Sequence, residues 1–351
     1  MKDRIQVQGF VLLDVDVVAL NNAGKDTASN FENAVKTKSI YKNGQNYVYV
    51  SGQAWRFWWR EALQKNLGWT LSPIQYGEKS QAFTSVNPIE YADDDVMGYM
   101  RAANEKIEEK GKTKSINITV TRVSPLKNSA LISVSSVRPV SNWSSMSRQN
   151  GDAVPYTRQE YCAIMKGMFS LDVDMVGTFS DYNKSGYKNL SEALQAEAIR
   201  VGAAKIQDPF GDGTLVRLPI ETRVKRATDT IAALKNISGG AMQTNNMGDV
   251  TPKFIVLATT STGNHPFSHI AISAGDRDER VVLNVEGIKE VLQDYKDTFK
   301  GKVFIGRRCG FFDEYDKDLI ALANEFSSLV EYSSVNSAID NYVEQLKVQM
   351  Q

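Results

Sequence analysis

The chain carries one short pattern twice, and this repeat restricts the fold more than any other feature. LDVDVV at residues 13–18 returns as LDVDMV at residues 171–176. The two copies lie in runs typical of β-strands, over residues 7–20 and 157–179, and a helical segment follows each run. Two related strand–helix halves are the organisation of a ferredoxin-like or RRM-like βαββαβ core. We therefore predict an α+β fold built on such a core.

The segment after the first strand predicts a helix with two different faces. Ser51 is a favourable N-cap residue, and Gly52 permits close backbone approach. The helix should end near Leu67. At 100° per residue one arc is apolar and the opposite arc is polar. The apolar arc consists of Trp55, Trp58, Trp59, Ala62 and Leu63, and the polar arc consists of Gln53, Arg56, Arg60 and Gln64.

The polar arc has the composition of a surface that binds a polyanion. Open N–H groups at Gly52 and Gln53 attract an anion, and Arg56 and Arg60 are forked donors for phosphate oxygens. Phe57 is an aromatic ring among these cations and could stack on a base. The alternative is an ordinary amphipathic helix whose arginines face water. Both interpretations are open at this point.

Charge is segregated along the chain although the whole is neutral. The 41 basic and 41 acidic residues cancel, so overall charge does not indicate nucleic acid. Residues 33–66 contain six Lys or Arg and one Glu, a net charge of +5, whereas residues 311–351 contain two Lys and eight acidic residues, a net charge of −6. A basic and an acidic region would suit RNA binding and head-to-tail contact between copies.

Composition and motifs argue against several classes of protein. Cys162 and Cys309 show neither metal-site spacing nor a disulfide framework, which indicates a reducing cytoplasm. Signal-peptide and membrane-span patterns are absent from the sequence, so we expect a soluble cytoplasmic protein. The sequence also lacks nucleophile-elbow, phosphate-loop and Rossmann patterns. We expect no catalytic residue and no cofactor.

Two sets of residues could suggest a metal, and we assign a metal to neither. Asp14, Asp16, Asp172 and Asp174 would bind Mg²⁺ only if the two strands brought all four together. His265 and His269 have the spacing of a helical pair, but Pro266 lies between them.

The rest of the chain predicts elements around the core. Residues 68–104 indicate an insertion, and residues 139–155 are rich in loop-forming residues. Gly239 and Gly240 predict a helix C-cap, or a place where RNA passes close to backbone amides. The other expected helices are residues 96–109, 190–205, 223–237, 285–299, 317–325 and 337–348; the other expected strands are 115–123, 130–137, 253–260 and one near Val303, with a hairpin at 208–219.

Four motifs, in order, resemble the Cascade backbone subunits of CRISPR systems, the Cas-seven family, and within it the DevR branch of type I-B systems. They are GFVLLDVDVVALNN from Gly9, a Ser-x-Gln-x-x-basic pattern at residues 51–56 followed by Arg60, RVSPLKNSAL from Arg122, and NISGGAMQTN from Asn236. Together they cover most of the chain.

The resemblance implies an RRM-like (ferredoxin-like) palm with inserted finger and thumb elements. Residues 1–67 would form the first half of the palm, 68–155 a finger or web insertion, 156–185 a palm strand, 186–222 a thumb-like insertion, and 223–351 the second half of the palm with the C-terminal helices.

The resemblance also implies a non-enzymatic subunit that stacks as a helical filament along the guide CRISPR RNA. It would grip the RNA backbone without sequence specificity and present the spacer to target DNA in antiviral defence. Its other partners would be further copies of itself and the Cas-five, Cas-eight, Cas-six and small Cascade subunits. The expected RNA-binding residues are Asn22, Lys36, Lys38, Ser51, Gln53, Arg56, Arg60, Arg223, Arg226, Gly239 and Gly240.

Two rival functions are open. Type III relatives of the family cut RNA with an aspartate in the loop after the first strand, and Asp26 is the only acid in residues 21–30. The name DevR suggests a DNA-binding regulator, although the sequence has no helix-turn-helix pattern.

Overall fold

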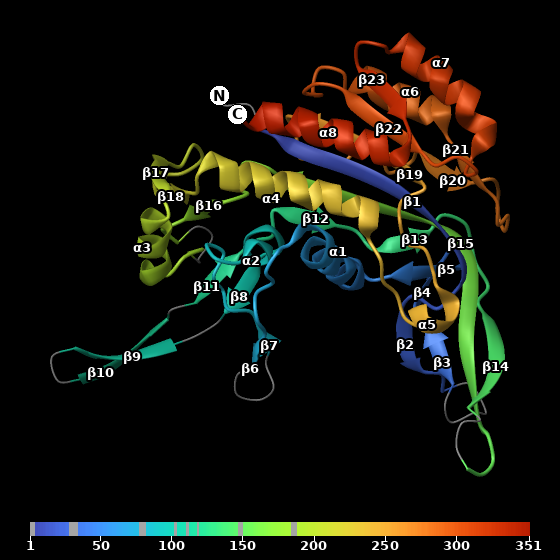
Figure 1. Ribbon diagram of the computed structural model, residues 1–351, viewed down its shortest axis with the longest axis horizontal. Coiled ribbons are helices and arrows are strands. Elements are labelled where there is room, and N and C mark those ends of the chain that lie inside the picture. The colour runs from blue at the N-terminus through green and yellow to red at the C-terminus, as the bar shows by residue number, and fades with distance from the viewer. Residues whose placement is uncertain are drawn as a thin grey trace.

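The computed structural model describes residues 4–27, 34–76, 82–101, 104–109, 112–117, 119–146, 150–183 and 188–351. Its centre is a large sheet, which confirms the α+β class. The main path runs through β23 (Val330–Ser333), β22 (Val303–Arg307), β19 (Phe254–Thr260), β1 (Gln6–Val18), β15 (Val154–Asp172), β13 (Leu131–Ser133), β5 (Gln45–Val50) and β4 (Ser39–Lys42). Two arms extend from this sheet toward the same side, with α1 (Gly52–Leu67) between them (Figure 1).

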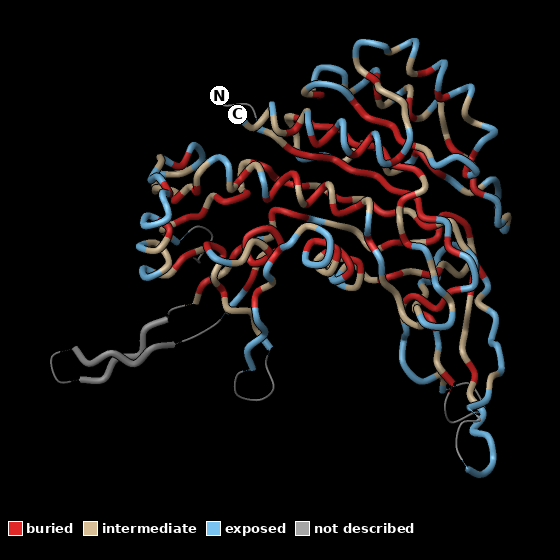
Figure 2. The backbone as a smooth tube through the Cα atoms, viewed as in Figure 1, coloured by how far each residue is buried: buried red, intermediate tan, exposed pale blue. Residues whose placement is uncertain are grey.

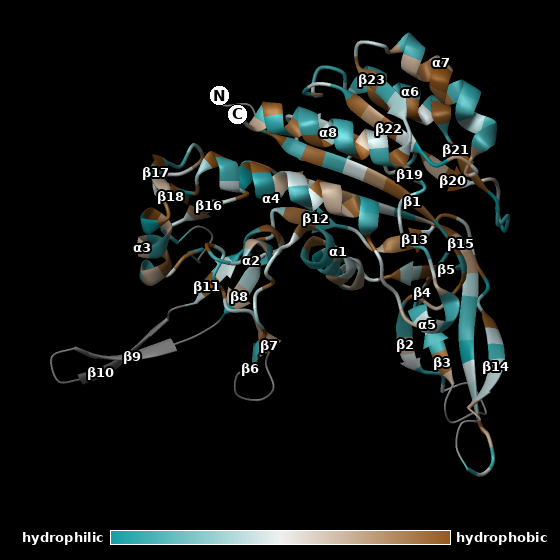
Figure 3. Ribbon diagram, in the orientation of Figure 1, coloured by the Kyte–Doolittle hydropathy of each residue, from teal (hydrophilic) through white to brown (hydrophobic). Residues whose placement is uncertain are grey.

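β1 is a central strand, and both of its faces are buried. Val7 and Val11 contact one hydrophobic core, whereas Phe10 and Leu12 contact another. Residues of α1, α4 (Ile220–Ala232) and α8 (Val335–Met350) supply the first core, and residues of α6 (Val285–Asp294) and α7 (Asp316–Glu325) supply the second. Figure 2 shows buried backbone along the sheet centre, and Figure 3 shows that its strands are largely hydrophobic. Helices therefore cover both faces of the sheet.

The two strands of the sequence repeat, β1 and β15, pair directly and run antiparallel. Gln6 lies opposite Asp172, and Asp14 lies opposite Ile164. The two aspartate pairs are therefore at opposite ends of the ladder, so the four carboxylates do not converge. Among the described residues there is no cluster of three or more potential metal ligands.

The arm nearer β15 continues the central sheet. It contains β2 (Asn22–Lys25), β3 (Val35–Thr37) and β14 (Val140–Met146), and β14 pairs with the first half of β15. The predicted loop at 139–155 is therefore wrong over β14, because this polar stretch forms a complete antiparallel ladder. Residues 28–33 and 147–149 lie outside the described residues.

The other arm consists of short strands around α2 (Ala92–Met97). These are β6 (Gln75–Tyr76), β7 (Ala82–Phe83), β8 (Tyr99–Arg101), β9 (Asn104–Glu109), β10 (Lys112–Asn117) and β11 (Val120–Arg122). The predicted helix at 96–109 is wrong. Gly98 ends α2 with a φ of 76°, and a Cβ there would lie 2.5 Å from the Arg122 carbonyl oxygen, so the chain turns and continues as strand. The strand predicted at 115–123 is divided between β10 and β11, and Ile118 lies outside the described residues.

The predicted insertion at 68–155 also contains strands of the central sheet. β12 (Leu126–Asn128) and β13 both pair with β15. A smaller sheet of β16 (Thr178–Ser180), β18 (Thr214–Arg217) and β17 (Ala204–Gln207) packs beside α3 (Glu192–Arg200), and β17 and β18 form the hairpin expected near 208–219.

The C-terminal part follows the sequence prediction closely. α6, α7, α8, β19 and β22 occupy the expected segments, and β20 (Ala271–Ser273) and β21 (Val281–Leu283) form an additional hairpin. None of the helices in the described part of the chain combines the length and apolar character needed to cross a membrane.

Candidate nucleic-acid interface

The turn after β1 joins three of the sites predicted from the sequence. The Asn21 side-chain oxygen accepts a hydrogen bond from the Ser51 N–H (3.0 Å). The Asn21 carbonyl accepts from the Lys38 N–H (3.0 Å), and the Leu20 carbonyl accepts from the Ala241 N–H (3.1 Å). The start of α1, the β3–β4 segment and the Gly239–Gly240 segment therefore meet here. The asparagine motif predicted the neighbouring Asn22, whereas the residue that makes these contacts is Asn21.

α1 has the cap and the buried arc that its sequence predicts. The Ser51 hydroxyl accepts a hydrogen bond from the Ala54 N–H, and Gly68 ends the helix with a φ of 70°. The buried residues of α1 are Trp55, Trp58, Trp59, Ala62 and Leu63, which confirms the predicted apolar arc. Gln53 and Phe57 are exposed, and Phe57 retains 56% of its accessible surface.

The sequence predicted an accessible Arg56 side chain, but other segments of the protein hold its guanidinium. Its Nε and Nη2 atoms both donate to Asn128 Oδ1 (3.0 and 2.7 Å), and Nη2 also donates to the Leu126 carbonyl (3.0 Å). Nη1 donates to the Met97 carbonyl and to Ser124 Oγ, each at 3.2 Å. Burial lowers the pKa of Arg56. The guanidinium links α1 to β12 and to the end of α2. A contact between Arg56 and phosphate stays a prediction, and the structure gives this side chain a structural role.

Arg60 is also held by the protein. Its Nη2 atom lies 2.5 Å from Asp93 Oδ2, and the Asp93 side chain is almost completely buried. Asp93 begins the acidic run in α2, which the sequence analysis placed in a separate insertion. Because this carboxylate pairs with Arg60, the structure does not present Arg60 as an unpaired donor, whereas Gln53 and Gln64 of the same arc are exposed.

Arg223 and Arg226 lie in the protein interior. Arg223 donates from Nε to the Val176 carbonyl (2.8 Å) and from Nη2 to the Val173 carbonyl (3.3 Å), and burial lowers its pKa to about 10. Arg226 Nη1 lies 2.7 Å from Asp95 Oδ2. Both side chains are buried, so the structure gives them internal partners, and their assignment as RNA-binding residues stays a prediction. These two arginines face inward because α4 packs against the core.

Gly239 and Gly240 are packing residues at the junction. A Cβ on Gly239 would lie 2.2 Å from Trp58 Cδ1, and a Cβ on Gly240 would lie 2.5 Å from Leu20 Cδ2. Gly240 has a φ of 105°. The helical segment before them ends at Asn236, so the predicted C-cap role is wrong. Both glycines let this segment lie directly on α1 and β1.

Four lysines carry the accessible positive charge of the segment from β2 to β4. Lys25, Lys36 and Lys42 are exposed and Lys38 is half-buried. In the described part of the chain none of the four forms an ion pair. Burial and the neighbouring Lys42 lower the pKa of Lys166. The segments that meet at Asn21 therefore carry exposed lysines, Gln53 and Phe57, whereas Arg56 and Arg60 contact other parts of the protein.

Replacing Arg56 by alanine should destabilise the protein. Its partners Asn128 and Leu126 would lose charge-assisted hydrogen bonds, so we expect the free energy of unfolding to fall by about 1–3 kcal/mol. Urea denaturation followed by tryptophan fluorescence measures this. A solvated arginine would give a change within about 0.5 kcal/mol, and that result would restore the surface interpretation.

Comparison with known proteins bears on the whole chain. A family model described as "CRISPR-associated negative auto-regulator DevR/Csa2" matches residues 11–295. A chain of a solved "CRISPR RNA-guided surveillance complex" is similar in structure at 11% sequence identity and a TM-score of 0.53, covering 97% of this chain and 99% of that chain. A second, from a "CRISPR RNA-guided surveillance complex, pre-nicking", is similar at 10% identity and a TM-score of 0.51, covering 97% and 100%. At such identities the likeness shows the fold. No curated protein gives a significant match.

Proposed function

Because the chain belongs to the CRISPR-associated DevR/Csa2 family, as its motifs predicted, we propose that it is the RNA-binding backbone subunit of a type I-B Cascade surveillance complex. The observation that carries this proposal is the junction at Asn21, which holds the start of α1 and the backbone at Lys38 together. Lys36 is exposed beside Lys38 on one of these segments, and Gln53 and Phe57 are exposed on the other. Lysines contact phosphates and an exposed ring stacks on bases, and neither requires a particular base sequence.

The topology supports an RRM-like palm. In chain order the relevant elements are β1, α1, β13, β15, α4 and β19, which is a βαββαβ sequence. In the sheet, β19 lies beside β1, β1 beside β15, and β15 beside β13. α1 and α4 contribute to the same core on one face. We assign this unit as the palm, the arm around α2 as an inserted finger element, and residues 186–222 as the thumb-like insertion.

The proposed assembly is a filament of identical copies along one guide RNA. Each copy holds a short length of RNA backbone at the surface that carries Lys36 and Lys38 and leaves the bases free to pair with target DNA. The acidic C-terminal region and the lysine surface suit head-to-tail contact between copies. The Cas-five, Cas-eight, Cas-six and small Cascade subunits complete the proposed complex, and the protein itself has no enzymatic step.

Replacing Lys36 and Lys38 together by alanine should weaken RNA binding about equally for all sequences. Each lost phosphate contact should reduce the slope of log K against log salt by about 0.7, the value for single strands. Fluorescence anisotropy with unrelated RNAs at several salt concentrations measures both effects, with duplex DNA as competitor. Duplex DNA that displaces RNA efficiently would favour the regulator instead.

Lys317→Ala is the matched control for the lysine variants. Lys317 is an exposed lysine on α7 and belongs to the layer on the other face of the sheet. It should leave affinity and salt slope unchanged. An equal loss in this control and in the double variant would mean that binding depends only on net charge.

Incubation with Mg²⁺ should leave guide RNA and paired target RNA intact. Asp26 is the acid in the predicted nuclease position, and its N–H donates to the Ala34 carbonyl (2.8 Å). Asp26→Asn should therefore change neither RNA binding nor RNA integrity. Cleavage by the unmodified protein that disappears in Asp26→Asn would replace the scaffold function with that of an endoribonuclease.

A further inference from the structure

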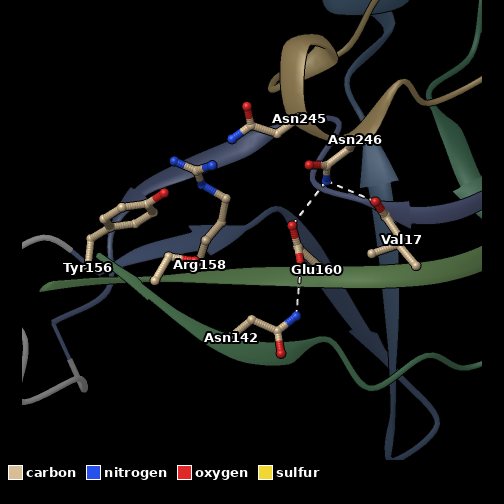
Figure 4. Close-up of a pocket in the computed structure, with 8 residues that line it drawn as sticks. Val17, Asn142, Tyr156, Arg158, Glu160, Asn245 and Asn246 are labelled. Atoms are coloured by element: carbon tan, nitrogen blue, oxygen red, sulfur yellow. Dashed lines mark hydrogen bonds between the residues drawn. The ribbon is translucent and has the colours of Figure 1, made fainter. Parts of the chain in front are cut away.

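A polar pocket of about 340 Å³ lies outside the residues assigned above. It is bounded by the β14–β15 hairpin, by α5 (Gln243–Asn246) and by the end of β1 (Figure 4). Its polar lining includes Asn142, Tyr156, Arg158, Glu160 and Asn245. Amides, a phenol, a guanidinium and a carboxylate form a lining that suits a polar ligand.

The backbone at this pocket is strained and held from several directions. Val17 has a φ of 44°, which a β-branched residue rarely adopts, and the β1–β15 register shifts between Val15 and Val18. The Val17 N–H donates to Cys162 Sγ (3.3 Å), and its carbonyl accepts from Asn246 Nδ2 (2.8 Å). Such strain persists where surrounding contacts enforce it and is frequent at binding sites.

The pocket has a hydrogen-bond-accepting end at Glu160. Its carboxylate accepts from Asn142 Nδ2 (2.7 Å) and from Asn246 Nδ2 (3.1 Å). Figure 4 shows these two amides on opposite sides of the carboxylate. A carboxylate can accept about four hydrogen bonds, so Glu160 retains the capacity to accept one more from a ligand hydroxyl.

The opposite end is cationic. The Arg158 guanidinium lies 5.3 Å from the centre of the Tyr156 ring, and Figure 4 shows it directed toward Asn245 rather than Glu160. Among the described residues Arg158 has no carboxylate partner and its guanidinium makes no hydrogen bond. A stacked, unpaired guanidinium is well suited to a phosphate.

The pocket adjoins the lysine surface. Arg158 lies opposite Val35 of β3, the residue before Lys36. Asn245 belongs to the segment that begins at Gly239 and lies on the end of β1. A strand of RNA held at the lysines could therefore continue into the pocket.

We propose that this pocket holds one nucleotide of the bound RNA, with the phosphate at Arg158 and the ribose 2′-hydroxyl donating to Glu160, so that it selects RNA over DNA. The inference rests on the proposed RNA-binding function and adds sugar recognition to it. DNA lacks the 2′-hydroxyl and would leave this acceptor unused. The contacts involve only backbone groups of the nucleotide, so selection is independent of base sequence.

The test compares RNA and DNA single strands of the same mixed sequence by fluorescence anisotropy. The unmodified protein should bind RNA more tightly than DNA. Glu160→Ala should weaken RNA binding roughly tenfold, as expected for one hydrogen bond to a charged group, and leave DNA binding nearly unchanged. Glu160→Gln keeps the shape and should give a smaller loss of the RNA-to-DNA ratio, which provides a second variant if alanine disturbs the arm.

Arg158→Ala should weaken RNA and DNA alike and lower the salt slope by about 0.7. Arg158→Lys should keep the slope. Arg200→Ala is the matched control, because Arg200 is an exposed arginine at the end of α3; it should change neither ligand.

The outcomes separate this inference from the proposed function. An RNA-to-DNA ratio unchanged by Glu160→Gln and Glu160→Ala in folded protein overturns the sugar contact. RNA affinity unchanged by Arg158→Ala overturns the pocket as a nucleotide site while RNA binding itself stands. Absence of RNA binding by the unmodified protein overturns the proposed function and this inference together.

Discussion

Replacing Asp95 by alanine is expected to lower the free energy of unfolding by about 3–5 kcal/mol, because it leaves two buried arginines without their shared carboxylate. Asp95 Oδ1 lies 2.5 Å from Arg122 Nη2, and Oδ2 lies 2.7 Å from Arg226 Nη1. Oδ2 also accepts from the Gly177 N–H (2.8 Å). The carboxylate thus joins α2 to β11, to α4 and to the chain before β16.

The matched control for Asp95 is Asp340→Ala. Asp340 pairs with Lys235 at 2.5 Å, but its side chain is 56% exposed, so its loss should cost less than about 1 kcal/mol. Asp95→Asn should fall between the two, since it keeps an acceptor and removes the charge. Urea denaturation measures all three. An Asp95→Ala effect no larger than the control would show that the buried arginines find other partners.

Replacing Trp59 by alanine should also cost about 3–5 kcal/mol. The Trp59 ring is fully buried, and its centre lies 5.0 Å from that of Phe169 in an edge-to-face arrangement. Its Nε1–H donates to the Thr230 carbonyl (2.7 Å). The substitution therefore removes a large apolar group and takes the indole donor away from the buried Thr230 carbonyl of α4.

Two variants separate these contributions. Trp59→Phe keeps an aromatic ring and removes the donor, so it should cost about 1–3 kcal/mol. Phe57→Ala removes a ring from the same helix at an exposed position and should change stability by no more than about 0.5 kcal/mol. Thermal and urea unfolding of the three variants provide the measurement. Equal destabilisation by Phe57→Ala would contradict the orientation of α1.

The parts of the fold that sequence analysis predicted well are those that local chemistry determines. For α1 the capping hydroxyl of Ser51 sets the start, and the 3.6-residue period places Trp55, Trp58 and Trp59 on the buried side. The repeated pattern likewise identified β1 and β15. Period and capping depend only on near neighbours in the chain, so one sequence suffices to predict them.

The environment of the polar arc depends on segments far away in sequence. Periodicity predicts that Arg56 and Arg60 point away from the tryptophans, but it does not show that Asn128 and Asp93 cover them. The acidic run at residues 93–95 has the composition of a solvated insertion, and its burial follows only from convergence with arginines of α1, β11 and α4. On the β3–β4 segment Lys36 is exposed and Lys38 is half-buried, and their contact with RNA stays a prediction.

β15 is one strand that runs from the arm into the centre of the sheet. It has 19 residues, a length of about 60 Å at strand spacing. Residues 154–160 pair with β14 in the arm, and residues 163–172 pair with β1. A force applied at the arm end of β15 is therefore transmitted to the ladder between β1 and β15, because no flexible linker separates the two. If a neighbouring molecule pulls on the arm, the rate of amide hydrogen exchange in β1 and β15 should change.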